Sequence, residues 1–178
     1  MKNILNLLLI ASAFVSASMS IRAAESPGLI DDLKPLTPYL GEWKMYWTDL
    51  NGQHMSGKAT LTAEAGGAII IFKTDLVGAE GKPLFSRVSV FFWNSESKSI
   101  AESNFDSNGW HGGNVLTKAT ATKWVWQGHG YSGEAKEGRS LTEMIKVDEN
   151  RWTAQFTKQV YNGQSFPDSP KFTFTRSK

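Results

Sequence analysis

The chain has 178 residues, of which 20% are charged, with 19 Lys and Arg against 17 Asp and Glu, three His and no Cys. The absence of Cys excludes disulfides, a Cys nucleophile and the acylated Cys of a lipoprotein. A formal net charge of only +2 gives no electrostatic reason to expect nucleic acid or an anionic membrane surface as the partner.

The first 24 residues have the layout of a secretory signal. Lys2 precedes an apolar run from Ile4 to Val15, which small residues follow. The run is shorter than the roughly 20 apolar residues that a transmembrane helix needs. We therefore expect a signal peptide over residues 1–24, cleavage between Ala17 and Ala24, and export to the periplasm or beyond.

The mature domain, residues 25–178, carries 17 basic and 17 acidic side chains, because the leader holds two basic residues and no acidic one. It is long enough to build one hydrophobic core. Its first segment, residues 28–39, has leucines at helical spacing, but Pro35 and Pro38 interrupt an α-helix there. We expect a short or broken helix that lies against the rest of the domain as a plug or strap.

From Gly41 onward the hydrophobic period changes to two. Trp43, Met45 and Trp47 alternate with polar residues, and residues 55–63 alternate more clearly still. Such alternation predicts strands with one buried and one solvated face. About ten segments of this kind follow one another, separated by turn signals at regular spacing. The expected fold class is an all-β, antiparallel up-and-down barrel of about ten strands, with the N-terminal helix closing one end.

The connections between these segments fall into two groups, because alternate turns of a meander lie at opposite ends of a barrel. The turns at the end of the helix are short, over residues 65–67, 94–98, 117–119 and 148–150. Most of the others are longer and Gly-rich, over residues 77–83, 107–113, 128–138 and 162–169. We expect the long-loop end to be the mouth through which a ligand enters.

Two short motifs near the ends of the chain resemble those of the calycin, or lipocalin-like, barrels. They are Leu40-Gly41-Glu42-Trp43 and Phe174-Thr175-Arg176, and the similarity runs from about Leu36 to Arg176. Within this class the chain is most similar to a bacterial family of exported domains of unknown function. The resemblance implies that Arg176 packs over Trp43 as a structural pair. A related haem-binding branch uses a histidine on its final strand, which this chain lacks, so no cofactor is expected.

The candidate ligand-binding residues come from the predicted interior and from the predicted rim. Inward-facing aromatic rings could line an apolar cavity or simply pack the interior. Arg87 shares a strand face with Phe91, and Glu143 shares one with Leu141. Arg87 could meet a ligand carboxylate that Glu143 orients, or both could serve structural ion pairs or face outward. The ligand-binding candidates are Trp47, Phe72, Arg87, Phe91, Trp110, His111, Trp124, Tyr131 and Glu143.

All three histidines, His54, His111 and His129, fall at the expected mouth. Three imidazoles could hold a zinc ion. However, these lie on different hairpins and lack the spacing of familiar metal motifs. We expect a solvated rim and no metal.

Signals for catalysis are few. The sequence contains no nucleophile elbow and no phosphate-binding loop. Glu102, Asn104 and Asp106 share one strand face and could include an acid or a base, but an exposed polar face explains them equally well.

The function we expect is a non-catalytic exported barrel that binds a small hydrophobic or amphipathic ligand at its long-loop end. Two alternatives remain open at this point. One is an enzyme of the isomerase or hydrolase type that uses cavity carboxylates, and the other is a structural or partner-binding barrel with a filled interior. A cavity of several hundred Å³ would favour ligand binding.

Overall fold

The structure, a computed structural model, describes residues 28–49, 52–78, 81–134 and 136–178. The predicted signal peptide, residues 1–24, lies outside the described residues. Within the described ranges, no helix has the length and hydropathy needed to cross a membrane. The elements there are η1 (Asp31–Tyr39), β1 (Gly41–Thr48), β2 (His54–Glu64), η2 (Ala65–Gly67), β3 (Ile69–Val77), β4 (Pro83–Asn94), β5 (Ser99–Asp106), β6 (His111–Ala119), β7 (Lys123–Tyr131), β8 (Glu137–Asp148), β9 (Arg151–Tyr161), β10 (Gln164–Phe166) and β11 (Phe172–Arg176).

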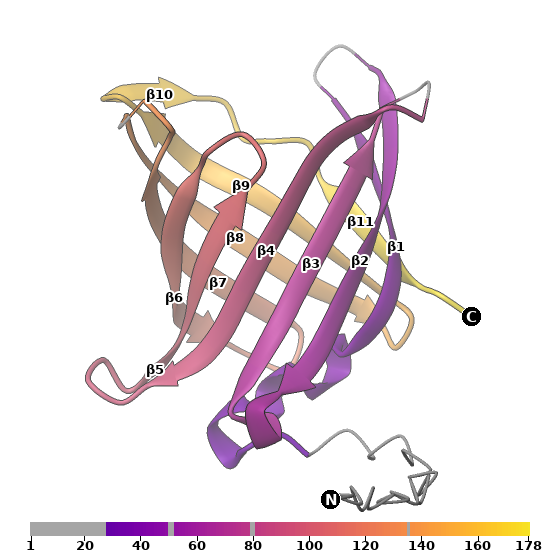
Figure 1. Ribbon diagram of the computed structural model, residues 1–178, viewed down its shortest axis with the longest axis vertical. Coiled ribbons are helices and arrows are strands. Elements are labelled where there is room, and N and C mark those ends of the chain that lie inside the picture. The colour runs from indigo at the N-terminus through magenta and orange to yellow at the C-terminus, as the bar shows by residue number, and fades with distance from the viewer. Residues whose placement is uncertain (1–27, 50–51, 79–80, 135) are drawn as a thin grey trace, which may run out of the picture.

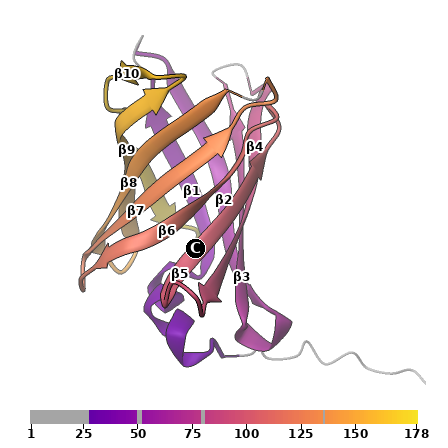
Figure 2. The ribbon, with the colours of Figure 1, turned by 90° about the vertical axis from the view of Figure 1, so that its left-hand side faces the viewer.

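Ten of these strands close into an antiparallel barrel. Each strand from β1 to β9 pairs with the next along the chain, β9 also pairs with β11, and β11 pairs with β1. The short strand β10 adds a hairpin to the end of β9. Figures 1 and 2 show the tilted strands running around the barrel in sequence order. The prediction of an all-β up-and-down barrel of about ten strands is confirmed.

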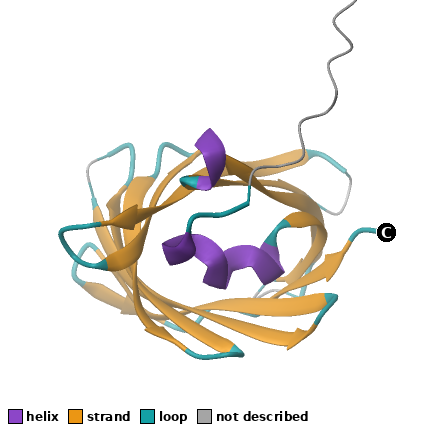
Figure 3. Cartoon of the chain, turned by 90° about the horizontal axis from the view of Figure 1, so that it is seen from below, coloured by secondary structure: helices purple, strands orange, loops and turns teal. Residues whose placement is uncertain are grey.

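The N-terminal segment closes one end of the barrel. Viewed along the barrel in Figure 3, η1 lies across the opening. Leu33, Leu36 and Tyr39 of η1 are buried. Pro35 and Pro38 lie within η1, and because each removes an N–H donor that an α-helix needs, the segment forms 3-10 turns. The expected short plug is therefore present at the predicted end.

The first and last strands of the chain meet at this closed end. Trp43 of β1 is the register partner of Arg176 of β11. The central guanidinium carbon of Arg176 lies 4.2 Å from the centre of the Trp43 ring. Arg176 also donates hydrogen bonds of 2.9 Å to the carbonyls of Leu40 and Pro38. The predicted packing of Arg176 over Trp43 is confirmed, and the pair ties η1 to both strands.

The prediction of long loops at the opposite end is wrong for two connections. The connection expected over residues 128–138 spans only 132–136. The one expected over residues 107–113 spans only 107–110. Gly112, Gly113, Gly128, Gly130 and Gly138 belong to strands that continue to the rim, so at these two connections the mouth is bordered by strand ends and short turns.

Two of these strand positions are occupied by glycine because a neighbouring ring lies too close to the backbone to leave room for a side chain. A Cβ atom at Gly130 would lie 2.6 Å from the ring of Trp110, and one at Gly138 would lie 2.5 Å from the same ring. Gly130 and Gly138 are register partners on β7 and β8. The two glycines therefore make room for an indole on the inner face of the barrel.

Candidate functional site

The barrel encloses a cavity of about 510 Å³. Leu36 and Tyr39 of η1 line its floor, and Leu84 and Asn108 line it towards the opposite end. The volume falls in the range of about 300 to 1,000 Å³ that is typical of small-molecule sites. The interior is therefore not filled by its own side chains, which removes the support for a filled structural barrel.

Tyr39 and Trp124 form part of the base beneath this cavity. Their ring centres are 4.9 Å apart, and the Trp124 indole N–H donates a 3.1 Å hydrogen bond to the carbonyl of Thr120. Burial disfavours the charged phenolate and raises the pKa of Tyr39 to about 12. Trp124 is not among the cavity-lining residues, so the expectation that it lines the cavity is wrong; its ring packs against η1 instead.

The apolar walls of the cavity are aromatic. Trp47, Phe72 and Phe91, three of the predicted interior residues, all line it, as does Trp126. The ring centre of Phe91 lies 5.3 Å from that of Trp126 and 6.3 Å from that of Phe72. The four rings come from four different strands. Each occupies an inward-facing position, and such positions recur at every second residue along a strand. They form a continuous apolar surface for a ligand body.

One wall of the cavity is polar and contains an ion pair. Arg87 of β4 and Asp106 of β5 are register partners, and an Arg87 Nη2 atom lies 3.3 Å from Asp106 Oδ2. Their side chains are 23% and 4% exposed. The Arg87 guanidinium also lies 5.3 Å from the ring centre of Phe85. Arg87 therefore faces inward and forms a structural ion pair, one of the alternatives that the sequence left open, with Asp106 as its partner.

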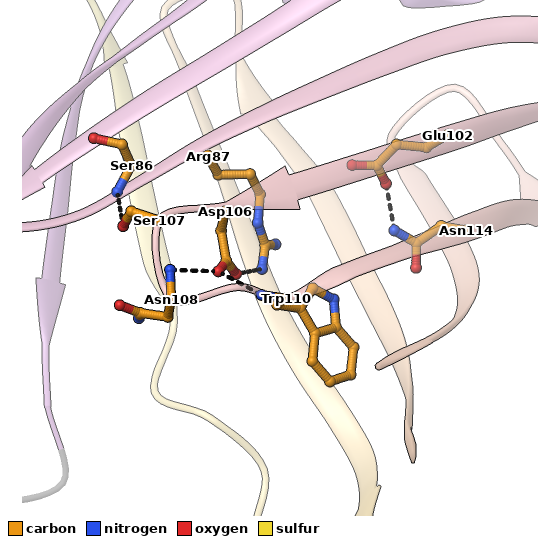
Figure 4. Close-up of polar contacts among 8 residues, drawn as sticks. All are labelled: Ser86, Arg87, Glu102, Asp106, Ser107, Asn108, Trp110 and Asn114. Atoms are coloured by element: carbon orange, nitrogen blue, oxygen red, sulfur yellow. Dashed lines mark hydrogen bonds and ion pairs between the residues drawn. The ribbon is translucent and has the colours of Figure 1, made fainter. Parts of the chain in front are cut away.

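Asp106 also holds the turn that follows β5. Its Oδ1 atom accepts backbone N–H hydrogen bonds of 2.9 Å from Asn108 and 3.1 Å from Trp110 (Figure 4). With Arg87 donating to the other oxygen, the carboxylate receives three donors. Asp106 therefore couples the conformation of the rim turn to the position of Arg87 in the cavity.

Glu102 is the second charged residue that lines the cavity. The side-chain amide of Asn114 on β6 donates a hydrogen bond to its carboxylate (Figure 4). No cationic side chain of the described residues forms an ion pair with Glu102. Asp106 lies four positions further along β5, about 13 Å away at about 3.3 Å per residue, and Arg87 lies opposite Asp106 on β4. The cavity wall therefore carries one uncompensated carboxylate.

Two further polar side chains on β4 and β5 are buried without partners, although neither is among the cavity-lining residues. Ser89 and Asn104 are register partners between Arg87 and Glu102, and they are 0% and 3% exposed. Ser89 Oγ and Asn104 Oδ1 have no hydrogen-bond partner among the described residues. A buried polar atom without a partner costs about 1–3 kcal/mol. Ser89 and Asn104 therefore carry hydrogen-bonding capacity that the described residues do not use.

The prediction that Glu143 faces the cavity is wrong. Its neighbours Thr142 and Met144 line the cavity, so the alternation of β8 turns Glu143 outward. The carboxylate lies 2.8 Å from Lys123 Nζ in a partly exposed ion pair. Leu141 also lies on this outer face. The sequence interpretation took the apolar Leu141 as a sign that its face of β8 points inward, and therefore placed Glu143 in the cavity.

The three predicted rim residues divide between the two faces of the barrel. The ring of Trp110 lies over the inner face at Gly130 and Gly138. His111 and Tyr131 are register partners at the ends of β6 and β7, and their ring centres are 6.0 Å apart. Both are exposed, and neither lines the cavity. They lie on the outside of the barrel near the mouth.

The histidines show no metal-binding arrangement. His54 Nδ1 lies 3.0 Å from the hydroxyl of Thr48, and the His111 ring is tilted by 32° to that of Tyr131. Across the described ranges, no three His, Asp or Glu side chains are grouped so that they could hold a metal ion.

The sequence interpretation underestimated the polar wall. Glu102, Asn104 and Asp106 do share a strand face, but that face also carries Ile100 and points into the barrel, while Phe105 on the other face is 56% exposed. Ile100 lies on the same face of β5 as Glu102, and its apolar side chain could have indicated in the sequence that this face is buried. Asn114 was not identified, because nothing local in the sequence links it to Glu102.

No family model matches the chain, and no curated protein matches it. Among solved structures, it is similar to a de novo designed fluorescence-activating β-barrel, with 10% identity and a TM-score of 0.41 over 83% of this chain and 100% of that chain. It is also similar to a redesigned β-barrel, mFAP1, bound to DFHBI, with 10% identity and a TM-score of 0.43 over 78% of this chain and 95% of that chain. Similarity at this level carries no functional inference, and the fold assignment rests on the strand pairings.

Proposed function

We propose that the protein is an exported, non-catalytic barrel that binds a small hydrophobic or amphipathic ligand. The observation that carries this proposal is the cavity of about 510 Å³, with aromatic rings in its apolar walls and a polar wall on β4, β5 and β6. An apolar pocket with a few convergent polar groups is the usual form of a small-molecule site. The aromatic walls would hold the ligand body, and the polar wall would hold its polar end.

The ligand would enter from the end opposite η1. Leu36 and Tyr39 close the floor, and the Arg176 hydrogen bonds hold η1 in place there. Leu84 and Asn108 line the cavity at the other end, where short turns join the strands. Trp110 lies on the inner face at that end, in a position to contact an entering ligand.

Export rests on the leader-like segment, residues 1–24. Expression in a bacterial host, followed by cell fractionation and intact mass measurement, tests it directly. A periplasmic product that has lost 17 to 24 residues is the expected result. A full-length product in the cytosol would contradict export without bearing on ligand binding.

Ligand binding is tested with native mass spectrometry of the protein purified from its own host, together with a fluorescence titration of the neutral probe N-phenyl-1-naphthylamine. Thr142 lies between Trp126 and Phe156 on the inner face, so Thr142→Trp should fill the cavity and abolish probe binding. Leu141→Trp places the same ring on the outer face and serves as the control. Equal probe binding by both variants would show that the probe does not occupy the cavity.

The inward orientation of Glu102 favours a second candidate, an enzyme of the isomerase or hydrolase type. Asp106 already accepts hydrogen bonds from Arg87, Asn108 and Trp110. Glu102 accepts a side-chain hydrogen bond from Asn114 and borders the cavity. If a co-purified ligand is converted over time by the wild type and not by Glu102→Gln, this second candidate replaces the non-catalytic one.

A further inference from the structure

The charges that border the cavity do not balance. Arg87 and Glu102 are the two charged residues in its lining. Arg87 already has a counter-ion, because Asp106 lies 3.3 Å away and is itself fixed by two backbone donors of the rim turn. Glu102 has an amide partner but no cationic one among the described residues. The cavity therefore presents one net negative charge to a ligand.

Aromatic rings lie beside this carboxylate. Phe91 is the register partner of Glu102, so the two inward-facing side chains are direct neighbours with Cβ atoms about 5 Å apart. The ring of Phe91 lies 5.3 Å from that of Trp126. A cation in this position would be attracted by the carboxylate and also by the faces of these rings. An anion would meet repulsion from both.

Two unpartnered buried acceptors lie on the strands that carry this carboxylate and its neighbour Phe91. Asn104 Oδ1, two residues from Glu102 on the same face of β5, is an acceptor without a donor, and Ser89 Oγ opposite it can accept as well. Both side chains are almost completely buried. The unpartnered donors among the described residues are Arg87 Nε and the indole N–H groups of Trp47, Trp126 and Trp152. The three indoles are neutral, and the charge of Arg87 is offset by Asp106 at 3.3 Å, so these donors leave the net negative sign of the cavity unchanged.

We propose that the cavity selects an organic cation, a molecule with an apolar body and a protonated or quaternary nitrogen that lies against Glu102, Phe91 and Trp126. This inference rests on the proposed ligand-binding function and specifies its ligand class. It also reverses the earlier expectation that Arg87 receives a ligand carboxylate, because the Asp106 partner leaves Arg87 neutralised.

Three probes with the same chain and different head groups test the proposal: octyltrimethylammonium, octanoate and 1-octanol. Their binding to the purified protein is measured by isothermal titration calorimetry below micelle-forming concentrations. We expect the cation to bind at least about tenfold more tightly than octanoate, because a carboxylate and two rings act on it at close range. Octanol should lie between the two.

The deciding variant is Glu102→Gln, which keeps an oxygen for the Asn114 amide and removes the charge. It should lose the preference for the cation while binding octanol as the wild type does, with an unchanged circular dichroism spectrum. Glu143→Gln removes a carboxylate from the outer face and should keep the full preference. A tighter affinity for octanoate than for the cation, or a cation preference that survives Glu102→Gln, would overturn the inference alone. Failure of all three probes to bind would overturn the proposed function itself.

Discussion

The guanidinium of Arg176 lies 4.2 Å from the ring centre of Trp43 and joins the last strand of the barrel to the first. The same guanidinium hydrogen-bonds to two carbonyls around the end of η1, those of Pro38 and Leu40. One side chain therefore contacts the first strand from the last, where their pairing closes the barrel, and hydrogen-bonds to the segment that forms the floor of the cavity. Its contribution is to stability and to the shape of the floor, and it has no part in the chemistry of the site.

Arg176→Met should destabilise the protein by about 2–3 kcal/mol, since it removes a cation–π contact and charge-assisted hydrogen bonds. Urea unfolding followed by tryptophan fluorescence gives the change. Arg151→Met is the matched control, because the Arg151 side chain is half exposed and pairs with Asp148 at 3.4 Å. Such a surface pair contributes less than about 1 kcal/mol. Equal losses in both variants would contradict the structural role of Arg176.

Gly138→Ala should displace Trp110 from the inner face of the rim. The added methyl group would lie 2.5 Å from the Trp110 ring, and overpacking of this kind costs about 1–3 kcal/mol. The thermal midpoint should fall and the near-ultraviolet circular dichroism should change. At Gly133 a Cβ would meet nothing closer than 3.9 Å, so Gly133→Ala should leave both measurements as they are. A silent Gly138→Ala would mean that Trp110 does not rest on these strands.

Tyr39 should make the protein sensitive to alkali. Burial raises its pKa from 10.0 to about 12, so between these values the unfolded chain loses the proton while the folded chain retains it. The stability that this group contributes is complete below pH 10 and is lost as the pH rises to 12, at up to about 1.4 kcal/mol per pH unit. Urea unfolding of wild type and Tyr39→Phe over this interval should give a steeper decline for the wild type. Parallel declines would show that Tyr39 titrates normally.

Asp106→Asn should free the charge of Arg87. The Asn side-chain oxygen can still accept the backbone N–H groups of Asn108 and Trp110, so the rim turn keeps its hydrogen bonds, but Arg87 loses its counter-ion. We expect a loss of stability of about 2–4 kcal/mol and an affinity for octanoate that rises about tenfold. Calorimetry and urea unfolding measure the two effects. An unchanged octanoate affinity would mean that Asp106 does not mask Arg87.

The control for this variant is Asp148→Asn. Asp148 pairs with Arg151 on the surface, and its side chain is 50% exposed. Its loss should cost less than about 1 kcal/mol and should leave the binding of all three octyl probes unchanged.

The barrel itself was predictable from the sequence because alternation is strong where one face is apolar. Trp43 and Met45 on β1, with Ala59 and Leu61 on β2, are buried as the pattern indicates. Strand order then places the first strand beside the last. The position of η1 at the short-turn end followed from the same reasoning.

The polar wall was harder to predict. The inward face of a strand is inferred from its apolar residues, and this inference gives the wrong face where the inward side chains are polar. On β5 the inward face contains Glu102 and Asp106, while Phe105 points outward. On β8 the outward face contains Leu141 beside Glu143. Partners such as Asn114 lie on a neighbouring strand, so only the register reveals them. Gly130 and Gly138 suggest a loop when only the sequence is read. The position of the Trp110 ring beside them explains why glycine occurs at these strand positions.

The joining of β1 to β11 has a consequence for synthesis. Arg176 and the carbonyl of Pro38 are 138 residues apart in the chain, so the base cannot be completed until the C-terminal strand has left the ribosome. Contacts between such distant positions slow folding. A nascent chain therefore cannot close its barrel before Arg176 has left the ribosome, which is compatible with the proposed export of an unfolded polypeptide.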